Sequence, residues 1–152
     1  MKTISSFTMA VALLAPTAFA DGSHASFGEP GRAADVSRTI KVRTLDTMKF
    51  DMSPAIGTIS KGETIRFVIS NPGQVEHEFA IGDAASQKAH AEMMQQMPGM
   101  QHHDEPGTVS LAPGQSKTLI WKFNKAVTGD IVLACHLPGH YQAGMHAEVK
   151  LK

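Results

Sequence analysis

Residues 135–145 read Cys135-His136-Leu137-Pro138-Gly139-His140-Tyr141-Gln142-Ala143-Gly144-Met145 and include the only cysteine of the chain. Written as spacing they form C-x4-H-x4-M, which puts a thiolate, an imidazole and a thioether on one short loop. Thiolates and thioethers are soft ligands that select transition metals over hard cations such as magnesium. Because a lone cysteine cannot form an internal disulfide, the spacing predicts that this thiol is a metal ligand.

One more ligand must come from elsewhere, and His77 is the best candidate. It shares its strand parity with Phe79 and Ile81, which places it on the core face, whereas Glu76 and Glu78 are predicted to point outward. Two imidazoles and a thiolate with a weak axial methionine suit copper that cycles between Cu(I) and Cu(II). The sequence therefore predicts one copper ion, held by His77, Cys135, His140 and Met145.

Two other interpretations of these residues are weaker. Structural zinc takes four strong nitrogen or sulfur ligands, and a methionine in the set fits it poorly. Cys135 and His140 could also be a nucleophile and its base, but no Asn or Asp is marked as the group that orients the base. Copper remains the favoured metal, and no catalytic residue is predicted.

Outward from this loop, short alternating segments separated by turn residues predict strands. About eight such strands without regular alternation of strands and helices indicate an all-β fold, a β-sandwich of one domain with a short helical Met/His-rich insertion. The predicted strands are 38–45, 48–52, 63–70, 75–81, 106–111, 116–123, 131–135 and 145–152.

The loop, taken with the distant His77, resembles the cupredoxins, the small type 1 copper proteins that include plastocyanin, azurin and auracyanin. The resemblance covers about Asp35 to Lys152. It implies a Greek-key β-sandwich, and it implies that the edge of His140 reaches the surface at an apolar patch where a redox partner protein docks. In many cupredoxins an Asn follows the first histidine and a Thr or Ser follows the cysteine, and the two brace the loop. Here Glu78 and His136 stand there, and we expect them to form a charged pair beside the copper ligands.

A second group of soft ligands lies between the predicted strands. Residues 84–97 are good helix formers, and Pro98-Gly99 ends the helix. Either this helix packs a methionine stripe on the sandwich, or it forms a surface cluster for Cu(I). Because thioether and imidazole both suit that ion, we favour a second copper site. Its candidate ligands are His90, Met93, Met94, Met97, Met100, His102 and His103.

The N-terminus has the features of a secretory signal. Lys2, a short apolar run and Ala18-Phe19-Ala20 predict a signal peptide over 1–20, cleaved after Ala20. Residues 21–34 are predicted to be flexible, and 35–152 to form the cupredoxin domain. No membrane span is expected in the mature chain, which would reside in the periplasm. Lys and Arg equal Asp and Glu at 14 each with no basic stripe, so no nucleic-acid partner is expected.

Three functions are compatible with these sequence features. The loop combined with the Met/His segment is similar to small periplasmic cupredoxins associated with bacterial copper resistance, which implies copper tolerance with redox cycling of the ion. A soluble electron carrier for a respiratory or photosynthetic chain is the alternative. The third function is that of an enzyme, either a copper oxidase or one half of a nitrite reductase. An enzyme of this kind would need a second copper ion with an open coordination position.

Overall fold

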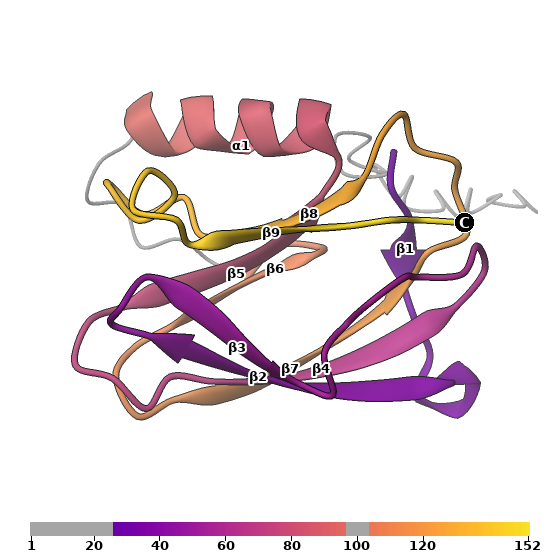
Figure 1. Ribbon diagram of the computed structural model, residues 1–152, viewed down its shortest axis with the longest axis horizontal. Helices are drawn as coiled ribbons and strands as arrows, with labels where there is room; N and C mark the ends of the chain where they lie inside the picture. The colour runs from indigo at the N-terminus through magenta and orange to yellow at the C-terminus, as the bar shows by residue number, and fades with distance from the viewer. Residues whose placement is uncertain (1–25, 97–103) are drawn as a thin grey trace, which may run out of the picture.

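The computed structural model describes residues 26–96 and 104–152, which form two β-sheets packed face to face with one helix outside them (Figure 1). The predicted β-sandwich is confirmed. One sheet has five strands in the order β1-β7-β4-β2-β3, and the other has four in the order β6-β5-β8-β9. The strands are β1 (Glu29–Pro30), β2 (Arg38–Leu45), β3 (Lys49–Ser53), β4 (Thr64–Ser70), β5 (His77–Gly82), β6 (Thr108–Leu111), β7 (Ser116–Lys122), β8 (Ile131–Ala134) and β9 (His146–Val149).

Strands that are distant in the sequence lie side by side in both sheets, as a Greek-key sandwich requires. Strand β7 lies between β1 and β4, and β5 pairs with β8. Only the β2–β4 pair is parallel among the strands that the structure describes, and it aligns Ile40 with Phe67 and Val42 with Ile69. The β5–β8 and β8–β9 pairs bring the regions around His77, Cys135 and Met145 to one sheet.

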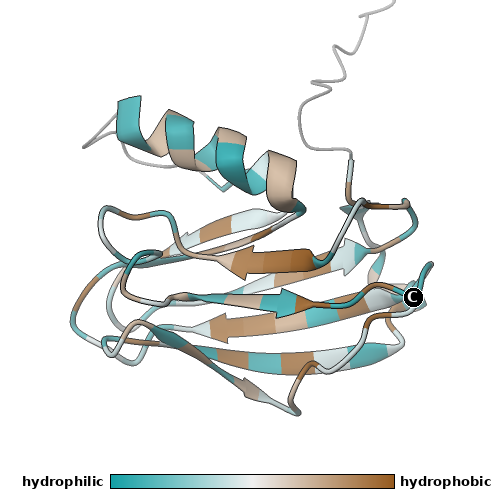
Figure 2. Ribbon diagram, turned by 45° about the horizontal axis from the view of Figure 1, so that its top comes forward, coloured by the Kyte–Doolittle hydropathy of each residue, from teal (hydrophilic) through white to brown (hydrophobic). Residues whose placement is uncertain are grey.

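The core lies between the sheets and follows from the period of two along each strand. Figure 2 shows apolar and polar residues alternating along the strands of the five-stranded sheet. The inward residues of β2 and β4, such as Ile40, Val42, Phe67 and Ile69, are fully buried. Phe79 from the opposite sheet meets Phe67 with ring centroids 5.3 Å apart. Burying such aromatic rings supplies much of the stabilisation of a small sandwich.

The N-terminal segment differs from the prediction that 21–34 is flexible. Phe27 is 1% exposed and stacks on Trp121 with ring centroids 5.1 Å apart. Strand β1 pairs with the edge of β7, and a 3-10 helix (Ala33–Asp35) follows it. The prediction is therefore wrong for residues 26–34. A segment rich in Gly, Ser and Ala shows no periodicity, but one aromatic side chain is enough to attach it to the core.

Helix α1 (Ala84–Gln96) packs outside the four-stranded sheet and confirms the predicted helix (Figure 1). Asp83 and Ser86 cap its start reciprocally, because the Ser86 N–H donates to Asp83 Oδ1 at 2.8 Å and the Asp83 N–H donates to Ser86 Oγ at 2.9 Å. Because α1 covers the sheet, all six residues of β5 are buried. No helix within 26–96 and 104–152 has the length and apolar character needed to span a bilayer.

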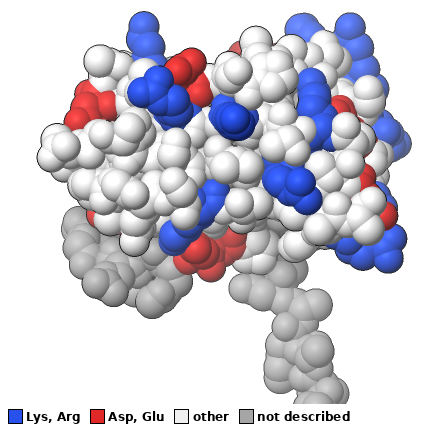
Figure 3. Space-filling view, turned by 90° about the horizontal axis from the view of Figure 1, so that it is seen from below, with Lys and Arg blue, Asp and Glu red and all other residues white. Residues whose placement is uncertain are grey.

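Within the described residues, no helix covers the outer face of the five-stranded sheet. Figure 3 views this face and shows Lys and Arg side chains separated by uncharged ones, with few acidic groups between them. Lys41 and Arg43 are exposed there, and Arg43 pairs with Asp51 at 3.2 Å. These charges are dispersed and do not form a stripe of the kind that follows a nucleic-acid backbone.

Candidate metal centre

Three of the four predicted ligands converge at one end of the four-stranded sheet. His77 opens β5, Cys135 directly follows β8, and His140 lies on the loop that leads to β9. Their donor atoms all lie within 4.8 Å of one another, and the Cys135 Sγ is 3.4 Å from the His140 Nδ1. The rings of His77 and His140 have centroids 5.2 Å apart. This geometry lets one ion contact two imidazoles and a thiolate together.

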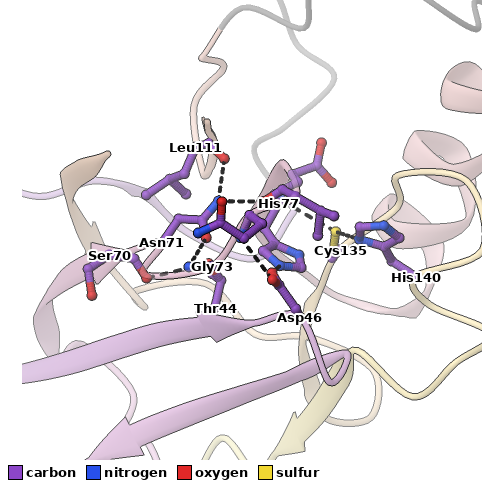
Figure 4. A network of polar contacts seen from close by, with 12 residues as sticks. Thr44, Asp46, Ser70, Asn71, Gly73, His77, Leu111, Cys135 and His140 are labelled. Carbon is purple, nitrogen blue, oxygen red and sulfur yellow. Dashed lines mark hydrogen bonds and ion pairs between the residues drawn. The ribbon is translucent and has the colours of Figure 1, made fainter. Parts of the chain in front are cut away.

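The two ring nitrogens of His77 have the surroundings expected of a metal-ligating histidine. The Nδ1 of His77 is buried and has no hydrogen-bond partner among the described residues. A buried polar atom without a partner costs free energy, and a metal ion would satisfy this one. The other ring nitrogen of His77 lies 3.2 Å from Asp46 Oδ1 (Figure 4). A partner on the second nitrogen is typical of metal-ligating histidines.

Met145 lies at the same end through the β8–β9 pairing. Ala134 and His146 are the last paired residues of these two strands, and Cys135 and Met145 are the next residues beyond that pair. The Cys135 N–H donates to the Met145 carbonyl at 3.1 Å, and the Met145 N–H donates to the His140 carbonyl at 3.0 Å. Met145 is fully buried. These bonds hold the loop closed and place the methionine beside the other ligands.

The electrostatics of the site depend on its burial. Burial raises the pKa of the Cys135 thiol to about 12. Burial, and then the neighbouring His77, lowers the pKa of His140, so its imidazole is neutral at neutral pH. A neutral imidazole can bind a metal at once, whereas the thiol must first lose its proton.

Comparison with known proteins agrees with this donor set. No family model matches the sequence. The chain is 46% identical to the "Copper-resistant cuproprotein CopI" of Rubrivivax gelatinosus, covering 93% of this chain and 92% of that protein. It is 37% identical to the protein of the same name from Pseudomonas aeruginosa, over 84% and 83% of the two chains. The chain belongs to the CopI family.

The fold of this CopI family member is also that of solved cupredoxins. Auracyanin B superposes with a TM-score of 0.58 at 19% identity, covering 84% of this chain and 96% of that one. The cupredoxin fold that the loop sequence implied is therefore confirmed. The cluster of His77, Cys135, His140 and Met145 is consistent with a type 1 copper site, and copper is the metal that fits this CopI family member.

A first prediction concerns the proton on Cys135. Because the thiol pKa of about 12 lies far above neutral pH, the metal-free protein carries this proton, and each copper that binds releases it. The apparent affinity for Cu(I) should therefore rise about tenfold per pH unit from pH 7 to 9. Calorimetric titration in two buffers of different ionisation enthalpy would give one proton released per ion. Release of no proton would mean that the thiolate already exists before the metal arrives.

Glu78 departs from the prediction that it points to solvent. It is fully buried, because parity gives only the face of the sheet and α1 covers that face. Its N–H donates to the Cys135 Sγ at 3.3 Å, and its Oε1 accepts from the His136 N–H at 3.1 Å. Glu78 thus braces the cysteine loop of this CopI family member from both its main chain and its side chain.

The prediction that Glu78 forms a charged pair with His136 is wrong, because each of the two side chains has a different partner. Glu78 Oε2 lies 2.9 Å from His90 Nε2, whereas His136 Nε2 lies 2.7 Å from Gln87 Oε1. Burial lowers the pKa of His136, and its neutral ring can donate to this amide oxygen. The Gln87 Nε2 also donates to the carbonyls of Ala80 and Val132, which fastens α1 to β5 and β8.

The structure describes three of the seven candidate ligands for a second copper. His90 and Met94 lie four positions apart on one face of α1, and this face turns toward the sheet and the loop. The side chain of His90 is 9% exposed and bonds to Glu78, and Met94 is 3% exposed. The prediction of a surface position is therefore wrong for these two. Met93 is half-buried. The remaining candidates Met97, Met100, His102 and His103 lie outside the described residues.

Two residues that support the site were not predicted, namely Asp46 and Gln87. Asp46 follows β2 and contacts His77 across 31 positions, and Gln87 contacts His136 across 49. Nothing local marks either residue in the sequence. Only the pairing of strands with each other and with α1 brings them to the loop.

Proposed function

We propose that this protein is an exported copper protein that contributes to copper tolerance and cycles one ion between Cu(I) and Cu(II). The observation that supports this most directly is the convergence of the unpartnered His77 Nδ1 with Cys135 Sγ and His140 Nδ1 in a buried position. Relatives that carry the name copper-resistant cuproprotein support the biological role.

The protein's own part in this chemistry is to hold the ligands still. Copper bound there would carry one electron by changing its oxidation state. The loop bonds among Cys135, His140 and Met145 and the brace from Glu78 fix the donors before the ion arrives. A donor set that suits both oxidation states keeps the rearrangement small when an electron moves.

The loop also supplies a route to a redox partner. Pro138 and Gly139 are exposed, and the neighbouring His140 is half-buried. We place the docking site of an electron-exchanging protein at this loop, because the ring of His140 is the ligand nearest to solvent. This feature favours the second candidate function, a soluble electron carrier.

Export and a second copper site complete the proposal. The predicted signal peptide over 1–20 lies outside the described residues. Its cleavage after Ala20 would release the mature protein into the periplasm, the compartment of the bacterial envelope where copper tolerance acts. For the second site, Met93, Met97, Met100, His102 and His103 supply thioethers and imidazoles that suit Cu(I). We propose that these residues hold a second copper ion as Cu(I).

The test is a copper titration of the metal-free mature protein, with the visible spectrum and total bound copper followed together. We expect one strongly coloured copper per chain and additional colourless Cu(I). The colourless copper should be lost when Met93, Met97 and Met100 become leucine, and it should persist in the matched control Met52→Leu on β3. One coloured copper with no further binding would favour the electron carrier, and absence of colour would refute the type 1 assignment.

A further inference from the structure

The carboxylate of Asp46 lies against a proposed copper ligand from outside the donor set. Asp46 directly follows β2, and its Oδ1 is 3.2 Å from the His77 Nε2. Its second oxygen, Oδ2, accepts the backbone N–H of Gln74 at 2.8 Å. Figure 4 shows Asp46 in contact with His77, with Cys135 and His140 close to the same ring. Both carboxylate oxygens thus contact nitrogen atoms at the start of β5 or in the turn before it.

The turn before β5 is shaped around this carboxylate. Asn71 is 1% exposed, and its side chain donates to the carbonyls of Val75 and Leu111 at 2.7 and 3.0 Å. Its Oδ1 accepts the Gly73 N–H at 3.0 Å. A Cβ on Gly73 would overlap Asp46 Oδ1, so the chain passes too close to the carboxylate for any larger residue. Asp46 therefore lies against a turn that is held in place by its own hydrogen bonds.

The contact decides which nitrogen of His77 carries the proton. The Asp46 carboxylate has one oxygen 3.2 Å from the Nε2 of His77, and its other oxygen accepts the Gln74 N–H. An ionised carboxylate can only accept hydrogen bonds. The Nε2 of His77 must then carry the hydrogen, which leaves the lone pair on Nδ1, the buried atom without a partner.

We propose that Asp46 is a positioning residue that presents the Nδ1 of His77 to copper and biases the site toward Cu(II). This inference rests on the proposed type 1 site. The carboxylate orients the ring through Nε2, and its negative charge makes His77 a stronger electron donor. A more basic ligand and a nearby negative charge stabilise the doubly charged ion more than the singly charged one. The side chain of Asp46 is 39% exposed, so water screens part of this charge and the effect is moderate.

The bond to Gln74 could mean that Asp46 only stabilises the turn. A role confined to the turn would change the melting temperature and leave the reduction potential of the copper unchanged. The potential therefore distinguishes the two roles. The Asp46→Asn side chain has only one oxygen. Its amide NH2 group would therefore face either the Gln74 N–H or the His77 Nε2–H, and two donors cannot bond to each other.

The experiment compares the copper-loaded wild type with Asp46→Asn and with Asp51→Asn, measuring reduction potential, visible spectrum and total copper. Asp51 is the matched control, because it loses the same charge in the same hairpin but bonds to Arg43. For Asp46→Asn we expect affinity for Cu(II) to fall about tenfold more than affinity for Cu(I). That ratio raises the potential by about 59 mV for a one-electron couple. The control should match the wild type.

Gly73→Ala provides a second variant that keeps the charge. Its added methyl displaces the carboxylate, so the potential should rise in the same direction as in Asp46→Asn. A coloured Asp46→Asn protein whose potential equals that of Asp51→Asn would overturn the role of Asp46 and leave the type 1 site intact. A colourless wild type would overturn the type 1 site and the role of Asp46 with it.

Discussion

The Cys135→Ser variant is expected to lose the visible colour of the copper-loaded protein and to bind copper at least about 100-fold more weakly, since changes outside the ligand shell already cost up to that factor. Cys135 is the only cysteine, so no other thiolate can replace it. The colour of a type 1 site comes from charge transfer between thiolate and copper, and a serine hydroxyl is a hard, weakly acidic ligand. Absorption spectroscopy with a competing copper chelator measures both effects.

Met145→Leu is the contrasting variant for this test. It keeps the thiolate and both imidazoles, and an axial methionine is a weak, distant ligand. The colour should therefore persist with a shifted band. Leucine also suits this fully buried position, so the loop should stay closed. A Cys135→Ser protein that kept its intense band would show that the colour arises at another centre.

The ligand loop could be predicted from the sequence because its information is local. Cys135, His140 and Met145 lie on one short connection, and their spacing alone indicates the site. The strands could be predicted for the same reason, since alternation over a few residues fixes a strand and its inward face. The prediction for 38–45 agrees with β2 at both ends. The prediction of His77 as a ligand needed two further observations, namely its strand parity with Phe79 and the resemblance of the chain to cupredoxins.

The layers beyond the sheets could not be predicted in this way. A period of two says which face of β5 carries Glu78, but it does not say whether water or another element covers that face. Here α1 covers it, so a glutamate that the pattern assigned to solvent is fully buried. Phe27 gives the opposite example, because a single aromatic residue in an aperiodic segment packs on Trp121.

The contacts that surround the ligands depend on tertiary structure and could not be assigned from the sequence. Asp46 meets His77, and His90 in place of His136 takes the side chain of Glu78. Each of these pairs joins elements that pack together only once the sandwich has formed. The ligands themselves are thus specified by local spacing, whereas the groups that orient and charge them are specified by the fold.

Loss of His90 should be among the most destabilising changes in this protein. Glu78 is fully buried beside the copper loop, and its Oε2 has His90 as a charged partner at 2.9 Å. Removing one member of a buried ion pair leaves the other charge uncompensated, which typically costs about 3–5 kcal/mol. We expect His90→Ala to lower the free energy of unfolding by about 4 kcal/mol near pH 6. Denaturant unfolding of the metal-free protein measures this without a contribution from copper binding.

The pH dependence of this loss distinguishes a charged pair from simple packing. Burial lowers the pKa of His90, but its hydrogen bond to Glu78 and the charges of Glu78 and Glu105 outweigh that effect and leave the pKa raised above 6.5. A raised pKa in the folded state contributes stability that is complete below the pKa of the unfolded chain and disappears as the pH rises through the folded value. The difference between wild type and His90→Ala should therefore shrink from pH 6 to pH 9.

His90→Gln is the matched control for the charge. Its amide can still donate a hydrogen bond to Glu78, but it never carries a positive charge. It should be destabilised less than His90→Ala at every pH and should approach the wild type as the pH rises and His90 itself becomes neutral. If both variants lost the same stability at pH 6 and at pH 9, the charge on His90 would have no role.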